Sequence, residues 1–142
     1  MKKWEETLSS HGHRITEPRK AVMAVLTATE VPLSAQEILE LGQARHAGLG
    51  LVTVYRTLEL FEELGLASRV HLPGGCHGFL GASPGHHHQL VCQRCGKAVE
   101  FRGYDELDEV IAQLEAQTGY EIGEHLLQLL GLCPECQRKD AE

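Results

Sequence analysis

Residues 86–101 read HHHQLVCQRCGKAVEF, and a second C-x2-C motif, Cys133-Pro134-Glu135-Cys136, lies near the end of the chain. Each motif places two thiolates on one tight turn, within reach of one ion at about 2.3 Å. Four thiolates from two such turns suit tetrahedral Zn²⁺. We therefore expect a structural zinc site that contributes folding free energy, formed by Cys92, Cys95, Cys133 and Cys136.

Two disulfides or a redox-active C-x2-C pair are the alternative interpretations of these cysteines. Against them, the start of the chain, MKKWEETLSSHG, lacks the apolar core of a secretory signal. Neither pair lies in a thioredoxin-like pattern of strand, helix and strand. No apolar run approaches the roughly 20 residues of a membrane span. We expect a cytoplasmic protein with no membrane partner.

Upstream of the histidine run, periodic apolar residues predict four helices followed by a hairpin. Thr16 is a candidate N-cap for the second helix, and Ser34-Ala35-Gln36-Glu37 has the form of a capping box for the third. Such helices ending in two strands make a winged helix-turn-helix. The expected elements are helices over residues 2–10, 16–28, 34–42 and 53–65, and strands over 69–72 and 78–80.

Residues 81–85, Gly-Ala-Ser-Pro-Gly, are the linker-like stretch of the chain and mark a hinge. We expect a winged-helix domain over 1–82 and a second domain, which carries the metal motifs, over 86–142. In the second domain we expect strands over 86–91, 97–101 and 120–132, and a helix that Asp105 caps and Gly119 ends. The predicted fold class is α+β, with a winged helix-turn-helix followed by a small α/β domain.

The charge is unevenly divided between these halves. The net charge of the chain is −7, but residues 1–83 carry eight Lys and Arg against nine Asp and Glu. Residues 84–142 carry five against eleven. Bound cations would offset part of this second charge, and the near-neutral first half can still bind phosphate if its cations share one face.

The order of motifs resembles the ferric uptake regulator (Fur) family of bacterial metal-dependent repressors, across essentially the whole chain. The matching stretches are HRITEPR (13–19), LSAQEIL (33–39), LVTVYRTLELFEELGL (51–66), HHHQLVCQRCGKAVEF (86–101) and EHLLQLLGLCPEC (124–136). The resemblance implies a homodimer that binds a palindromic double-stranded DNA operator, with 1–82 as its winged-helix DNA-binding domain and 86–142 as its dimerisation and metal-binding domain. It also implies regulatory metal sites near the hinge.

The second helix of a helix-turn-helix lays its first residues on base edges. Thr53, Tyr55, Arg56 and Thr57 occupy that position, and the buried stripe of the helix is expected to leave Thr53, Arg56 and Thr57 on its outer face. The resemblance adds Arg14, for the adjacent minor groove, and we expect Arg19 to supplement it. Solvated charge for the two arginines and core packing for Tyr55 are the alternatives.

The resemblance also implies a first regulatory site formed by His86, His88, Asp108 and His125. Glu106 and Glu109 are alternatives to Asp108, because one extra residue precedes the helix here. A second regulatory site is expected from Cys76, His87, Glu100 and His71. A turn cysteine without a metal role is the alternative for Cys76.

The metal that is sensed stays open at this point. Iron-responsive members typically draw on a histidine between helices two and three, a wing glutamate and two histidines of the run. The corresponding residues here are Pro32 or Leu33, Leu80, His87 and Gln89. A thiolate in the wing favours Zn²⁺, so the zinc-uptake-regulator (Zur) branch is expected, with iron- or manganese-responsive regulation as the alternative. Bound metal is expected to fix the winged helices at the operator spacing.

Two other classes compete with a regulator. A zinc-dependent hydrolase would use His86, His88 and His125 with an open coordination position, but no HExxH or other general-base motif accompanies them. A zinc-storage protein would bind metal without metal-dependent DNA binding. We therefore expect no enzyme activity.

Overall fold

The computed structural model describes residues 2–72, 75–83, 87–102, 106–123, 125 and 127–141. Four helices and a hairpin come first: α1 (Lys2–Ser10), α2 (Glu17–Thr27), α3 (Ala35–Gln43), α4 (Leu51–Glu63), β1 (Ala67–His71) and β2 (His77–Gly81). The remaining elements are β3 (His87–Cys92), β4 (Ala98–Arg102), α5 (Glu106–Thr118), β5 (Gln128–Gly131) and α6 (Pro134–Ala141). None of the described helices is both long and apolar enough to cross a membrane.

The helix starts follow from local capping. The Thr16 side chain accepts a hydrogen bond from the Arg19 backbone N–H at 3.3 Å, which satisfies an otherwise unpaired donor of α2. Ser34 and Glu37 form the reciprocal capping box at the start of α3. Both caps confirm the sequence prediction.

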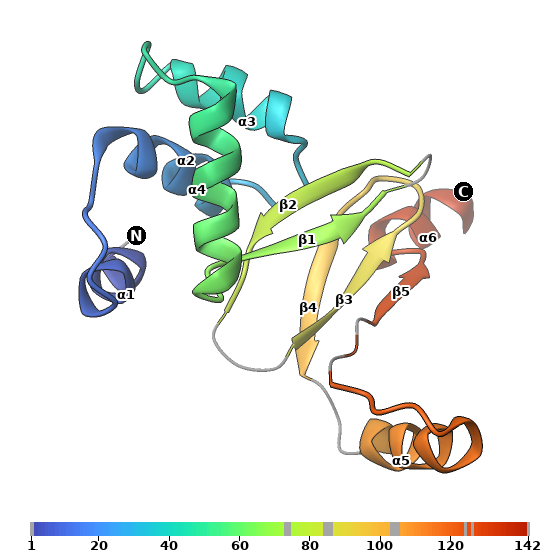
Figure 1. Ribbon diagram of the computed structural model, residues 1–142. Helices are drawn as coiled ribbons and strands as arrows, with labels where there is room; N and C mark the ends of the chain where they lie inside the picture. Colours follow the sequence, from blue (N-terminus) through green and yellow to red (C-terminus); the bar gives the residue numbers. More distant parts are fainter. Residues whose placement is uncertain are drawn as a thin grey trace.

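The first four helices and the hairpin enclose one apolar core. Trp4 and Leu8 of α1 are buried, as their spacing predicted, and the Trp4 ring meets Phe61 of α4 edge to face at 5.2 Å. Leu33 forms an isolated antiparallel bridge to Phe79 of β2, which attaches the α2–α3 loop to the hairpin. These elements form the predicted winged helix-turn-helix, in which α4 is the second helix of the motif (Figure 1).

The second sheet has strand order β4-β3-β5, with β3 antiparallel to β4 and parallel to β5. The hairpin lies between the helices and this sheet (Figure 1). Val70 and Leu80 of the hairpin form a second small buried cluster with Val91 of β3. The wing is therefore packed directly against the second sheet.

The C-terminal elements differ from the prediction. The last strand covers only Gln128–Gly131, so the prediction of a strand from residue 120 was wrong over residues 120–123, 125 and 127. An additional short helix, α6, begins directly after Cys133. Gly119 lies beyond the end of α5 with φ +74°, as a C-terminal glycine should. The expected cap, Asp105, lies outside the described residues.

Candidate metal centres and DNA-binding helix

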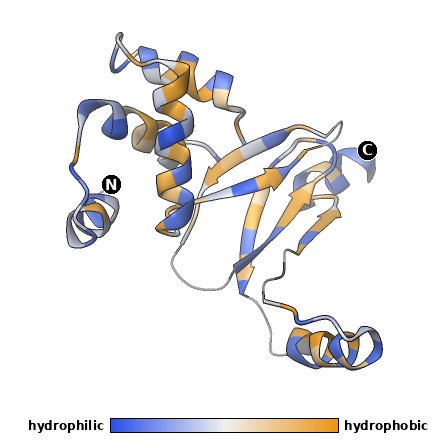
Figure 2. Cartoon of the chain, viewed as in Figure 1, coloured by the Kyte–Doolittle hydropathy of each residue, from blue (hydrophilic) through white to orange (hydrophobic). Residues whose placement is uncertain are grey.

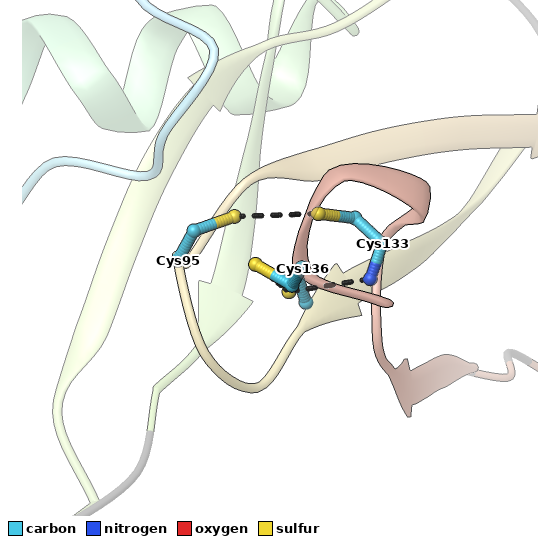
Figure 3. Close-up of side chains that lie close together, drawn as sticks. Cys95, Cys133 and Cys136 are labelled. Atoms are coloured by element: carbon cyan, nitrogen blue, oxygen red, sulfur yellow. Dashed lines mark hydrogen bonds between the residues drawn. The ribbon is translucent and has the colours of Figure 1, made fainter. Parts of the chain in front are cut away.

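The two C-x2-C motifs meet because β3 and β5 are parallel neighbours. Cys92 ends β3 opposite Gly131, the last residue of β5, and Cys133 follows two residues later. Cys95 lies in the turn after β3, where Gly96 adopts φ +80°, and Cys136 lies in the first turn of α6. Strand pairing therefore brings both turns to one end of the sheet (Figure 3).

The four sulfur atoms have the spacing of a tetrahedral metal site. They all lie within 4.8 Å of one another. The Cys92 and Cys136 sulfurs are 3.8 Å apart, and those of Cys95 and Cys133 are 3.7 Å apart. A tetrahedral ion with four sulfurs at about 2.3 Å has sulfur to sulfur edges of about 3.8 Å. Every one of these cysteines is a free thiol, so the cluster fits a metal ion rather than disulfides.

Backbone donors prepare part of this cluster for metal. The Cys133 backbone N–H donates to the Cys92 sulfur at 3.4 Å, and this bond, with those from the Cys95 and Arg94 backbones, lowers the Cys92 pKa to about 5. Hydrogen bonding among the neighbouring sulfurs, first from Cys133, raises the Cys136 pKa to about 12. The thiolate is the metal-binding form, so the first ligand is already charged at neutral pH.

Charged side chains surround the four-cysteine cluster. The Arg94 guanidinium donates to the Asp140 carboxylate and, at 3.5 Å, to the Cys136 carbonyl. The Lys97 ammonium lies 3.8 Å from Glu135 and 3.4 Å from Glu30 of the α2–α3 loop. Glu135 and, next, Glu30 raise the pKa of Lys97. These contacts fix the turn and tie it to the helical domain.

A second group of metal-ligating side chains lines a cleft of about 550 Å³ between the wing and the second sheet. The wing strand β1 forms one wall, and β3, β4 and the segment before β5 form the other. The imidazole and carboxylate groups in its lining belong to His71, His87, His88, His125, Glu62 and Glu100.

His88 and His125 are the best-placed pair in this cleft. Their ring centres are 5.1 Å apart, and the buried His88 ring also lies 5.6 Å from Phe101. Two imidazoles that share one tetrahedral ion, each nitrogen about 2.0 Å from the metal, have ring centres roughly 5 Å apart. The pair therefore fits joint coordination of one ion, with no change in ring separation.

Helix α4 presents an exposed N-terminal face away from the core. Thr53, Tyr55 and Arg56 are exposed, the tyrosine by 51%, whereas Val54 and Leu58 are buried. Its N-cap, Gly50, makes no side-chain capping bond, so the first backbone N–H groups are available to a phosphate. Aromatic, cationic and hydroxyl groups on one helix end suit base edges and phosphates.

The sequence matches the ferric uptake regulator family over residues 10–130. The ferric uptake regulation protein of Legionella pneumophila is 36% identical over 93% of this chain and 97% of that protein. The chain belongs to the ferric uptake regulator family. The peroxide operon regulator of Bacillus subtilis (strain 168) is 30% identical over 99% of this chain and 95% of that protein.

Solved structures of this family share the fold. A zinc uptake regulator complexed with zinc and DNA superposes with a TM-score of 0.83 at 22% identity, over 98% of this chain and 93% of that one. Holo XcZur gives 0.77 at 26% identity, with 96% of each chain covered. The Helicobacter pylori ferric uptake regulator gives 0.61 at 22% identity, over 96% and 90%. The protein is therefore a metal-responsive, DNA-binding regulator of this family and not an enzyme.

Several residues assigned to metal sites by resemblance to the ferric uptake regulator family do not lie at those sites in the structure. Asp108 is exposed on α5 and Cys76 is exposed in the wing turn, and neither lines the cleft. Among the described residues, the four cysteines are the one set of three or more ligands close enough for one ion, so Cys76 does not join His87 and Glu100. His86 and the side chain of Glu106 lie outside the described part of the chain, and Glu109 is exposed on α5.

The predicted DNA-binding residues differ in their exposure. Thr57 is only 4% exposed, so its placement on the outer face was wrong: it falls on the same side of α4 as Val54, three residues before it. Arg14 is exposed, and the Arg19 guanidinium donates to the Arg14 carbonyl at 2.6 Å. Val52, 64% exposed beside Thr53, is an apolar candidate for a thymine methyl that periodicity had left unassigned.

The sequence analysis did not predict the hydrogen bonds that three side chains of the second sheet make to the wing and to the residues just after it. The Gln128 side chain accepts from the His71 backbone N–H at 2.9 Å and donates to its carbonyl at 2.8 Å. Gln89 donates to the Ser68 hydroxyl, and Glu100 accepts from the Ser83 backbone N–H at 3.1 Å. No spacing rule marks such bonds. Gln89 stands where iron-responsive members were expected to place a histidine, and this departure was the one sign in the sequence that the residue has a different role.

Proposed function

We propose that this protein is a cytoplasmic, zinc-responsive homodimeric repressor that binds a palindromic operator when metal fills the cleft. The observation that carries the proposal is the His88 and His125 pair, 5.1 Å between ring centres, in a cleft whose opposite wall is wing strand β1. An ion at this pair, with His71, His87 and Glu100 nearby, ties the DNA-binding domain to the second sheet. The four-cysteine cluster then holds a separate, structural zinc ion.

The choice of zinc is supported by the departures from an iron site. Leu80 is buried with Val70 and Val91 in the apolar cluster between wing and sheet, so the position expected to carry a wing carboxylate offers no ligand. Gln89 is 8% exposed and engages Ser68. The remaining imidazoles suit Zn²⁺. The high fold similarity to the two zinc-regulator structures agrees with this choice.

The homodimer is supported by apolar side chains left uncovered in a single chain. On one face of the second sheet Leu90 is aligned with Val99 and Leu129, and the three are 41%, 57% and 46% exposed. Val110 and Leu114 of α5 are also exposed, and α5 stands away from the sheet (Figure 1, Figure 2). A second copy that covers these side chains removes apolar surface from water. Sedimentation equilibrium measures the mass directly.

The test of the proposed function is DNA binding at buffered free metal. Duplexes selected from a random pool in the presence of zinc serve as operator, and fluorescence anisotropy is read anaerobically at graded free Zn²⁺, Fe²⁺ and Mn²⁺. We expect Zn²⁺ to switch binding on at the lowest free concentration, and His88→Ala with His125→Ala to abolish the switch. The wing variant Cys76→Ala is the matched control and should behave as wild type. Equal binding of operator DNA with and without metal would contradict the proposal. Binding switched on by Fe²⁺ or Mn²⁺ at a lower free concentration than Zn²⁺ needs would replace zinc with that metal.

A further inference from the structure

The end of the wing hairpin carries a second pair of imidazoles. His71, the last residue of β1, and His77, the first residue of β2, are direct partners in the antiparallel register. Their ring centres are 4.8 Å apart with an angle of 57° between the ring planes, and both side chains are exposed. Only His71 of the two lines the cleft, so the pair lies at its mouth and faces outward.

This ring separation is compatible with coordination of one shared metal ion. Two imidazoles on one tetrahedral ion have ring centres roughly 5 Å apart when each nitrogen lies about 2.0 Å from the metal. The separation also matches that of His88 and His125 in the cleft, 5.1 Å. Both rings are exposed, and either can rotate about its side-chain bonds to present a nitrogen.

The backbone beneath the pair is held in place from both sides. The Leu72 backbone N–H donates to the Cys76 carbonyl at 2.8 Å, which closes the turn directly beyond the two histidines. The Gln128 side chain holds both backbone polar groups of His71. The backbone therefore loses little conformational entropy when an ion joins the two rings, and the cost that remains is that of fixing the two side chains.

We propose that His71 and His77 form a third metal site, a two-imidazole site for a borderline divalent cation such as Zn²⁺, with water completing the coordination. Cys76 does not belong to it, because the four-cysteine cluster is the one set of three or more close ligands among the described residues. An ion at this site links the two wing strands at the point where Gln128 attaches the wing to β5. His71 also lines the cleft, but the site needs neither DNA nor the cleft pair, so it can be tested apart from the proposed zinc-responsive function.

The test counts zinc ions in full-length protein whose cleft pair is removed by His88→Ala and His125→Ala and whose four cysteines are already loaded. Calorimetric titration with Zn²⁺ should show one further equivalent, and the ring proton resonances of both His71 and His77 should shift together. Adding His77→Gln or His71→Gln should weaken this equivalent at least about tenfold. His11→Gln, at an exposed histidine beyond α1, is the matched control and should leave it unchanged.

Two results would overturn the site. In one, the cleft-deleted protein binds no zinc beyond the four-cysteine ion. In the other, His71→Gln removes the additional equivalent while His77→Gln does not, which would assign that ion to His71 with His87 and Glu100 of the cleft. The stoichiometry is measured without operator DNA, so the result stands apart from the test of zinc-dependent binding.

Discussion

Cys92 shows how one hydrogen-bonded sulfur links protonation to folding. Its pKa of about 5 lies below the ordinary value near 9, because backbone N–H groups stabilise the thiolate in the folded chain. Between these two pH values the Cys92 thiol is protonated in the unfolded chain and ionised in the folded chain, so the stability of metal-stripped protein rises with pH. Above pH 9 the stability falls as pH rises, because the raised pKa of Cys136, about 12, keeps this thiol protonated in the folded chain.

We therefore expect the melting temperature of metal-stripped protein to climb from pH 5 to pH 9 and to fall above pH 9. Cys92→Ser should flatten the climb, because serine does not titrate there. The same variant should lose one equivalent of zinc by atomic absorption, since three sulfurs remain. A climb of equal size in Cys92→Ser would show that another group is responsible.

At Gly78 an added methyl group would meet the rigid ring and backbone of a proline. A Cβ there would lie 2.6 Å from the Pro32 Cβ and 3.2 Å from the Pro32 backbone carbon, where the wing strand passes the α2–α3 loop. We expect Gly78→Ala to lower the free energy of unfolding by about 1–3 kcal/mol in urea titrations. Gly123→Ala is the control, because a Cβ there meets no atom within 4 Å. Equal stability of the two variants would contradict the tight packing.

Helix α4 carries two adjacent residues with opposite exposure at its N-terminal end. Arg56 is exposed, whereas Thr57 is buried. Arg56→Ala should weaken operator binding and reduce the slope of log affinity against log salt by about 1, as the loss of one phosphate contact does. Thr57→Val should leave that slope unchanged. A lowered slope in Thr57→Val alone would restore Thr57 as a DNA contact.

The elements that the sequence predicted correctly are those with local causes. Thr16 and Ser34 cap helices through residues three positions away, so their signals are complete within a short segment. The four cysteines were predicted by their spacing, and pairing of β3 with β5 brings them together.

The C-terminal strand could not be delimited in this way. Its apolar run continues through Leu129 and Leu130, which are 46% and 56% exposed in the single chain. Apolar periodicity records that a side chain is buried but not which chain buries it. The pairing of His88 with His125 came from family resemblance, and the Gln128 bonds to a backbone carry no sequence pattern at all.

At the scale of the whole molecule, the wing is attached to the second sheet by bonds that need no metal. Gln128 holds the His71 backbone, Gln89 donates to Ser68, and Glu100 accepts from the Ser83 backbone. Lys97 adds an ion pair to Glu30 beside the four-cysteine cluster. A metal ion at the proposed cleft site would therefore act on a wing and a sheet that these bonds already hold together, and it would supply only the rest of the free energy that fixes their arrangement.

Removing one of these attachments should loosen the hinge without removing metal. Gln128→Ala deletes two hydrogen bonds to the partly exposed wing end, which we expect to cost about 1 kcal/mol, or roughly fivefold in operator affinity. Small-angle scattering of the metal-free variant should give a larger radius of gyration than wild type, while its zinc stoichiometry stays the same. Gln93→Ala, at an exposed glutamine in the turn after β3, should change neither quantity. If Gln128→Ala binds operator as wild type does and keeps the same radius, the hinge is set by the metal ion and the apolar cluster of Val70, Leu80 and Val91, and the direct bonds between wing and sheet contribute nothing to it.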